Sequence, residues 1–188
     1  MAKETKQHIL RGFSQLLNDN DFDKITVTML VEKCSISRQT FYYHFADIQA
    51  LINWGVQQYT HGCVEITKNA KNMEEATVIY LNGIKKNQLF LKKCFSSSLA
   101  QYMTKLIRNS VIEYSAEFYR RSVKSEYSKT ETADFIIEFA ANGVTGFIIS
   151  EILDNDDVNI EELSQKMYNC IFSRLAGGNY PAKIANDI

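Results

Sequence analysis

The fold of this chain is decided by residues 26–45, which read TVTMLVEKCSISRQTFYYHF. Thr26 precedes an apolar segment with helical spacing, and a threonine hydroxyl can accept a free N–H group of a first helical turn. Ser37 stands in the same position before residues 38–45. Residues 34–36 lie between the two segments and suffice for a tight turn. The stretch therefore predicts two short helices joined by a three-residue turn.

The side chains of this stretch divide into an apolar set and a polar set. A small core is expected from Leu30, Val31, Ile36 and Phe41. The remaining side chains of the second helix are expected to project outward: Arg38, Gln39, Thr40, Tyr42, Tyr43 and His44. Arginine pairs with guanine and glutamine with adenine, while threonine, tyrosine and histidine suit phosphate oxygens. The pattern favours a helix that enters the major groove of DNA. The alternative is a solvated face beside ordinary core aromatics.

The rest of the chain is patterned for helices, and its one proline, Pro181, lies close to the C-terminus. Because proline interrupts helices, its absence from residues 1–180 favours an all-α fold. Asp47 is well placed to cap the fourth helix, and Asn159 with Glu162 forms a plausible capping pair for the last one. Apolar residues at helical spacing predict further helices over residues 3–18, 47–68, 74–93, 96–124, 131–152 and 160–175.

The net charge of the 188-residue chain is −1, and acidic and basic residues balance within residues 1–55. DNA binding there requires positive charge to gather on one face, with the acids of residues 18–23 turned away from phosphate. No signal peptide is recognisable, and no apolar run is long enough to span a bilayer. The four cysteines form no CxxC pair, which disfavours a metal site and favours reduced thiols in a cytoplasmic protein.

Residues 26–45 resemble the DNA-binding signature of TetR-family regulators, which ends in a similar aromatic run. Residues 37–45, with Trp54 downstream, also look like the branch related to the dihydroxyacetone-kinase activator. The resemblance covers residues 5–55. It implies that the DNA bases are faced by Arg38, Gln39 and Tyr43. It implies equally that the DNA backbone is contacted by Thr26, Ser37, Thr40, Tyr42 and His44.

Two features of the chain depart from that family pattern. Ser35 stands in the turn where the family often has glycine. A serine in the left-handed backbone conformation is less stable than a glycine there by roughly 1 kcal/mol. Ile48 stands where the family usually has lysine, and Ala46 is also uncharged. Two phosphate contacts are therefore expected to be missing, which lowers the expected affinity or its salt dependence.

The C-terminal half carries two weaker patterns. Small residues beside large ones predict a homodimer seam, with a close-packed internal core as the alternative: Ala140, Gly143, Gly146 and Phe147, with Met167 and Ile171 on the last helix. Scattered aromatics predict a pocket for a small molecule, again with ordinary core as the alternative: Phe90, Phe95, Tyr102, Phe118 and Tyr119.

The sequence thus favours an all-α regulator with two domains. Residues 1–50 are expected to form a helix-turn-helix domain, and residues 51–188 a helical domain for dimerisation and ligand sensing. The expected partners are double-stranded DNA with a palindromic site, a second copy of the chain and a candidate small-molecule effector. An alternative is a helical ligand-binding or protein-interaction module that has lost DNA binding. No catalytic, metal-binding or cofactor motif is recognisable, which places an enzyme well behind both.

Overall fold

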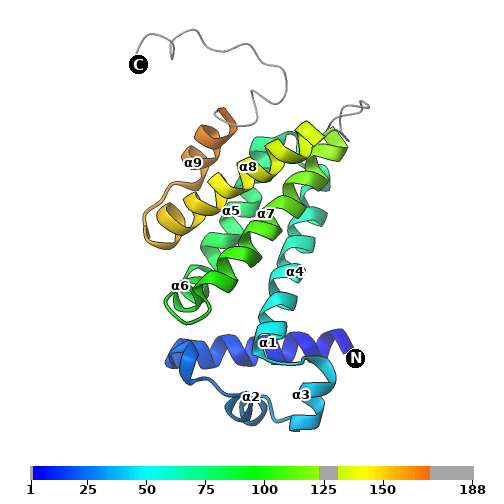
Figure 1. Cartoon of the computed structure of the whole chain (residues 1–188), viewed down its shortest axis with the longest axis vertical. Coiled ribbons are helices and arrows are strands. Elements are labelled where there is room, and N and C mark those ends of the chain that lie inside the picture. Colours follow the sequence, from blue (N-terminus) through cyan, green and yellow to red (C-terminus); the bar gives the residue numbers. More distant parts are fainter. Residues whose placement is uncertain (1, 123–130, 170–188) are drawn as a thin grey trace.

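The computed structural model describes residues 2–122 and 131–169, and it contains no strand within those ranges. The α-helices are α1 (Ala2–Asp19), α2 (Val27–Lys33), α3 (Arg38–His44), α4 (Ile48–Ile66), α5 (Met73–Lys86), α6 (Gln88–Phe95), α7 (Ala100–Ser122), α8 (Glu131–Phe147) and α9 (Ile160–Met167). We call α1–α3 the head and α4–α9 the body. Figure 1 shows the head at one end of the molecule, with α4 running from it into the body. The all-α prediction is confirmed.

The head is held together by one apolar core. α1 contributes Ile9, Phe13 and Leu17, all buried, and α1 packs on both α2 and α3. The expected core is confirmed, since Leu30, Val31 and Phe41 are buried and Ile36 packs against them. The second helix of the motif therefore keeps its apolar side inward and its polar side free.

Side-chain caps set the starts of these helices, as the sequence predicts. The Thr26 hydroxyl accepts a hydrogen bond from the Met29 N–H at the start of α2 (3.3 Å). The Asp47 carboxylate accepts one from the Ala50 N–H at the start of α4 (2.7 Å). At α9 the side-chain Oδ1 of Asn159 accepts a hydrogen bond from the Glu162 N–H (3.0 Å), which confirms the expected cap. Each cap satisfies an N–H group that has no partner inside its helix.

The predicted helix over residues 74–93 is instead two helices, α5 and α6, divided at Asn87. The Asn87 side chain donates to the Gly83 carbonyl (2.8 Å), and such local bonds compete with the helical backbone. The chain then turns again at residues 96–99, after the break expected at residues 94–95. α8 ends in a π-helical turn, Ile148–Leu153. None of the described helices is long and apolar enough to cross a membrane.

The body is built around α7, which packs against α4 on one side and α8 on the other (Figure 1). A buried polar network joins α4, α5 and α7, because the Ser110 hydroxyl of α7 bonds both the Thr60 hydroxyl (2.5 Å) and the Tyr80 hydroxyl (2.8 Å). Burial also raises the pKa of the Cys63 thiol, and it raises the pKa of Cys94 to about 12. These two thiols are therefore protonated near neutral pH.

α1 approaches α2 closely because residue 12 is glycine. A Cβ atom at Gly12 would overlap the Sγ of Cys34, whereas a Cβ atom at Gly62 of α4 would meet nothing within 4 Å. Both glycines lie inside helices, so both carry the same helix-propensity cost relative to alanine. The two positions therefore differ in packing alone.

We expect Gly12→Ala to destabilise the protein although alanine is the better helix former. Overpacking costs about 1–3 kcal/mol, which exceeds the gain of about 1 kcal/mol in propensity. Gly62→Ala, the control, should raise the free energy of unfolding by up to about 1 kcal/mol. Urea unfolding followed by circular dichroism measures both variants. A Gly12→Ala protein as stable as Gly62→Ala would contradict the close approach.

Candidate nucleic-acid interface

The solvent-facing side of α3 carries the most exposed aromatic side chains of the head. Tyr43 is 82% exposed and Tyr42 is 55% exposed, whereas Phe41 of the same helix packs into the core and is fully buried. Arg38 and Gln39 are also exposed, and Thr40 and His44 are half-buried. Figure 1 places α2 and α3 at the outer end of the head, away from the body. The structure thus brings the predicted α3 residues together on one outward face.

Two of the predicted contact residues act in the structure as caps. The Ser37 hydroxyl accepts the Thr40 N–H (3.0 Å) and also bonds the Thr40 hydroxyl (2.8 Å). Thr26 has the same role at α2. Capping fixes where α3 begins and therefore which of its residues face outward.

Arg38 is held by a residue that the sequence analysis missed. Its guanidinium group donates to the hydroxyl of Thr28 on α2. Thr28 lies ten positions earlier and on another helix, so only the packing of α2 against α3 reveals the pair. The contact restricts the direction in which Arg38 extends from the head.

The turn between the two helices has the strained backbone that the sequence suggested. Ser35 has a φ of 52°, in the left-handed region. Its N–H donates to the Glu32 carbonyl (3.1 Å), and the N–H of Ile36 donates to the Val31 carbonyl (3.0 Å). These hydrogen bonds terminate α2 and fix the backbone that leads into α3.

A cation–π cluster fixes the far end of α3. The Phe45 ring lies 5.9 Å from the Trp54 ring, and the Lys6 ammonium group lies 5.3 Å from the first and 5.8 Å from the second. Lys6 thereby ties the start of α1 to the junction of α3 and α4. The sequence analysis did not single out Lys6, because nothing local links it to residues so far along the chain.

The acidic loop after α1 faces the body. Asp23 accepts hydrogen bonds from the Ser98 hydroxyl (2.6 Å) and the Ser98 N–H (3.3 Å). Asp21 pairs with Lys24 at 2.7 Å, and the hydrogen bond and charge of Lys24 lower the pKa of the Asp21 carboxyl. At least Asp23 is therefore directed at the α6–α7 turn rather than at the exposed face of α3.

Lys93 of α6 forms the second link between head and body. Its ammonium group donates to the carbonyls of Leu17 (2.5 Å) and Asn18 (2.7 Å) at the end of α1. A cation at a helix C-terminus satisfies carbonyls that have no helical partner and complements the helix dipole. The orientation of α1 therefore depends on α6.

The aromatic residues predicted to line a pocket are not gathered in one place. Phe90 lines a cavity between head and body, whereas Phe95 and Tyr102 pack elsewhere against the core. The Tyr102 hydroxyl bonds the Gln49 carbonyl (3.4 Å). The side chains of Phe118 and Tyr119 lie outside the described residues.

The residues predicted for a dimer seam also separate. Ala140 and Met167 are buried inside the protomer, and Ile171 lies outside the described residues. Gly143, Gly146 and Phe147 are exposed on α8. Their face also carries the stacked rings of Phe135 and Phe139, which are 69% and 73% exposed.

Two family descriptions match the chain. "Bacterial regulatory proteins, tetR family" matches residues 9–53, and "Transcriptional regulator C-terminal region", a TetR-type description, matches residues 71–173. The HTH-type dhaKLM operon transcriptional activator DhaS of Lactococcus lactis subsp. lactis (strain IL1403) is 24% identical over 91 residues, which are 48% of this chain. The chain spans about half the length (49%) of this curated relative.

Solved structures share the fold along most of the chain. The dihydroxyacetone kinase operon activator DhaS superposes with a TM-score of 0.66 at 18% identity, covering 94% of this chain and 98% of that one. The TetR family repressor AlkX from Dietzia sp. strain DQ12-45-1b superposes with a TM-score of 0.60 at 16% identity, covering 92% and 98%. The resemblance seen in the sequence is confirmed. Each matched description is that of a regulator.

We expect Ser35→Gly to stabilise the head. Glycine adopts a positive φ without the steric cost that a Cβ atom brings, so the free energy of unfolding should rise by up to about 1 kcal/mol. Ser35→Ala keeps the Cβ atom and is the matched control, with no gain expected. Thermal unfolding compares the three proteins, and an equal gain from both substitutions would rule out the backbone explanation.

Proposed function

This chain belongs to the TetR family of bacterial regulatory proteins, and on that premise we propose that α3 reads a palindromic site in double-stranded DNA. The observation that carries the proposal is the outward face of α3, where exposed polar and aromatic side chains surround a buried Phe41. A seven-residue helix with six outward side chains can bury little in a core, but it can make many contacts in a DNA groove.

The side chains of α3 fall into two roles. Arg38, Gln39 and Tyr43 are exposed and are assigned to base edges, since arginine and glutamine make bidentate pairs with guanine and adenine. Contacts to phosphate, which carry no sequence information, are assigned to Thr40, Tyr42 and His44. Thr26 and Ser37 belong to the same surface and contribute mainly by fixing the helix starts.

Arg38→Ala and Gln39→Ala should each cost about 1–3 kcal/mol in binding and relax the preference at one position in each half-site. Tyr42→Phe is the control, because loss of a phosphate contact should weaken binding to all sequences alike. Fluorescence anisotropy at one fixed salt concentration, on sites selected from randomised duplexes, measures these effects. An Arg38→Ala protein with unchanged affinity and preference would show that α3 does not read bases.

The same selection separates this function from an alternative. The balanced charge of residues 1–55, with Ile48 where the family usually has lysine and with Ala46 also uncharged, favours a helical interaction module that has lost DNA binding. Such a module would enrich no sequence from the randomised pool. The cation of α3 itself argues for DNA binding, because Arg38 is exposed.

We assign the exposed face of α8 to a homodimer seam. Phe135, Phe139, Gly143, Gly146 and Phe147 recur at helical spacing, and exposed apolar patches of this kind mark interaction surfaces. Gly143 and Gly146 meet no other atom within 4 Å of a built Cβ, so a partner helix has room to approach. A two-fold dimer suits a palindromic site, since its reading helices then lie about 34–36 Å apart.

Phe139→Glu should convert a dimer into a monomer, because a carboxylate would have to be buried against a second carboxylate at the seam. Leu89→Glu is the control, since Leu89 is also exposed (59%) but lies on α6, away from that face. Sedimentation at micromolar concentration measures both variants. A wild-type protein that sediments as a monomer, both with and without DNA, would contradict the proposed seam.

The remaining features of the proposal follow the two-part architecture. We propose a DNA-binding domain of residues 1–50 and a sensing and dimerisation domain of residues 51–188. The boundary between them then falls at the start of α4. A small-molecule effector would act by binding two head orientations unequally. Reduced, buried thiols fit a cytoplasmic location.

A further inference from the structure

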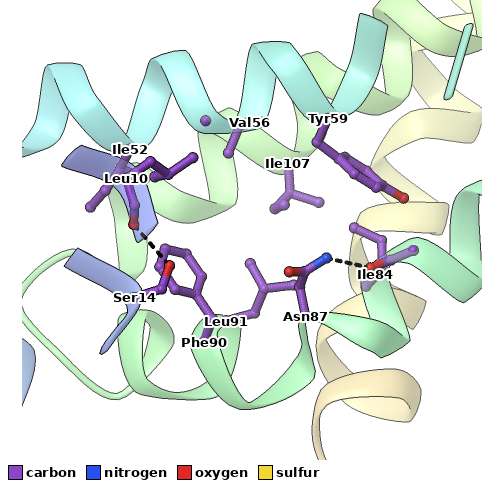
Figure 2. Close-up of a pocket in the computed structure, with 12 residues that line it drawn as sticks. Leu10, Ser14, Ile52, Val56, Tyr59, Ile84, Asn87, Phe90, Leu91 and Ile107 are labelled. Carbon is purple, nitrogen blue, oxygen red and sulfur yellow. Dashed lines mark hydrogen bonds between the residues drawn. The ribbon is translucent and has the colours of Figure 1, made fainter. Parts of the chain in front are cut away.

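A cavity lies at the joint between head and body (Figure 2). Its volume is about 120 Å³, and its walls come from α1, α4, α5, α6 and α7 together with Asn87. α1 contributes Leu10 and Ser14, so the wall includes the head itself. An occupant would therefore touch head and body at once.

The walls of this cavity are apolar and uncharged. Figure 2 shows Ile52 and Val56 of α4 opposite Phe90 and Leu91 of α6. None of the lining residues is an aspartate, glutamate, histidine, lysine, arginine or cysteine, and Tyr59 is the one titratable residue among them. A charged ligand would lose its hydration there without a counter-charge, which excludes organic anions and cations.

Asn87, which is exposed, supplies a polar atom at the open side of the cavity that an occupant can use. The hydroxyl of Ser14 donates to the Leu10 carbonyl (3.1 Å), and the hydroxyl of Tyr59 donates to the Tyr80 carbonyl. The Asn87 nitrogen donates to the Gly83 carbonyl (2.8 Å), which turns its side-chain oxygen toward the cavity (Figure 2). That oxygen accepts no hydrogen bond from any residue in the described ranges.

The size of the cavity limits the ligand further. An apolar cavity of about 150 Å³ holds one benzene molecule, and drug-sized ligands need about 300 Å³ or more. The cavity of about 120 Å³ is slightly smaller than the benzene-binding one but is partly open to solvent, so it fits at most one six-membered ring whose substituent reaches the opening. Larger lipids or polycyclic compounds do not fit without a rearrangement.

We propose that this cavity binds a small neutral molecule the size of a six-membered ring, bearing one hydroxyl group that donates to Asn87. The site differs from the aromatic cluster expected from the sequence, because it shares only Phe90 with that set. Its occupant bears directly on α1, so no relay through the body is needed.

The consequence for the head rests on the proposed DNA-binding function. Leu10 packs over Gly55 of α4, where a Cβ atom would lie 3.1 Å from the Leu10 Cδ1 atom. A molecule against Leu10 that binds more tightly when α1 lies further from α4 moves α1 outward, while Lys93 holds the C-terminal end of α1. The head then pivots about the Lys93 contact, and the spacing of two reading helices in a dimer changes.

Phenol is the probe, and methyl NMR of the full-length protein locates it. Phenol should shift the methyl signals of Leu10 and Val56, in wild type and in the control Ser14→Ala. Ser14→Leu fills the cavity from α1, and Val56→Phe fills it from α4; both should abolish the shifts while circular dichroism reports a folded protein. Toluene, which lacks the donor, should bind about tenfold more weakly, and benzoate should not bind.

The outcomes separate the site from the proposed function. Phenol shifts confined to other methyl groups, or retained in both folded filling variants, would overturn the site. Equal affinity for toluene and phenol would overturn the role of Asn87. DNA affinity is measured separately by anisotropy with and without phenol. Phenol bound at Leu10 with unchanged DNA affinity would remove the pivot and leave the site, whereas absence of DNA binding altogether would count against the proposed function alone.

Discussion

The apolar face of α1 packs against the rest of the head on one side and against the body on the other, and both parts depend on these contacts. Phe13 lies edge-on to Phe22 within the head at 6.1 Å and edge-on to Phe90 of α6 at 5.9 Å. Because one ring serves both contacts, the orientation of the head cannot change without repacking the body. Gly12 makes this arrangement possible by letting α1 approach Cys34.

α6 extends the constraint from α1 to the far side of the body. Lys93 caps the carbonyl end of α1, and Gln88 donates to the carbonyls of Ile152 (2.8 Å) and Leu153 (3.2 Å) at the end of the π-helical turn. Lys85, on the neighbouring helix, donates to the loop carbonyls of Asn155 (2.9 Å) and Asp156 (2.6 Å). One short helix and its neighbour thus satisfy the free carbonyls of two segments distant in sequence. The head and the α8–α9 region are joined through these bonds.

Two exposed aromatic surfaces lie at different parts of this framework. Tyr42 and Tyr43 project from the head, and Phe135 and Phe139 project from α8 in the body. Leaving large rings in water is unfavourable, so each surface suits the partner that we propose for it: base pairs and phosphates at α3, and a second protomer at α8. The cavity beside Leu10 lies between the head and body, where a ligand can act on their relative orientation.

The sequence by itself determined what depends on residues close along the chain. The caps Thr26, Ser37, Asp47 and Asn159 each bond an N–H three or fewer positions away, so helix starts, the strained turn at Ser35 and the outward face of α3 were predictable. The break at Asn87 was missed although its signal is local, because asparagine is common inside helices too. Only the tertiary structure decided which distant residues meet. Thr28 with Arg38, Lys6 with Trp54, Lys93 with Leu17 and the walls of the cavity depend on how rigid helices cross, and that geometry follows from the packing of all of them at once.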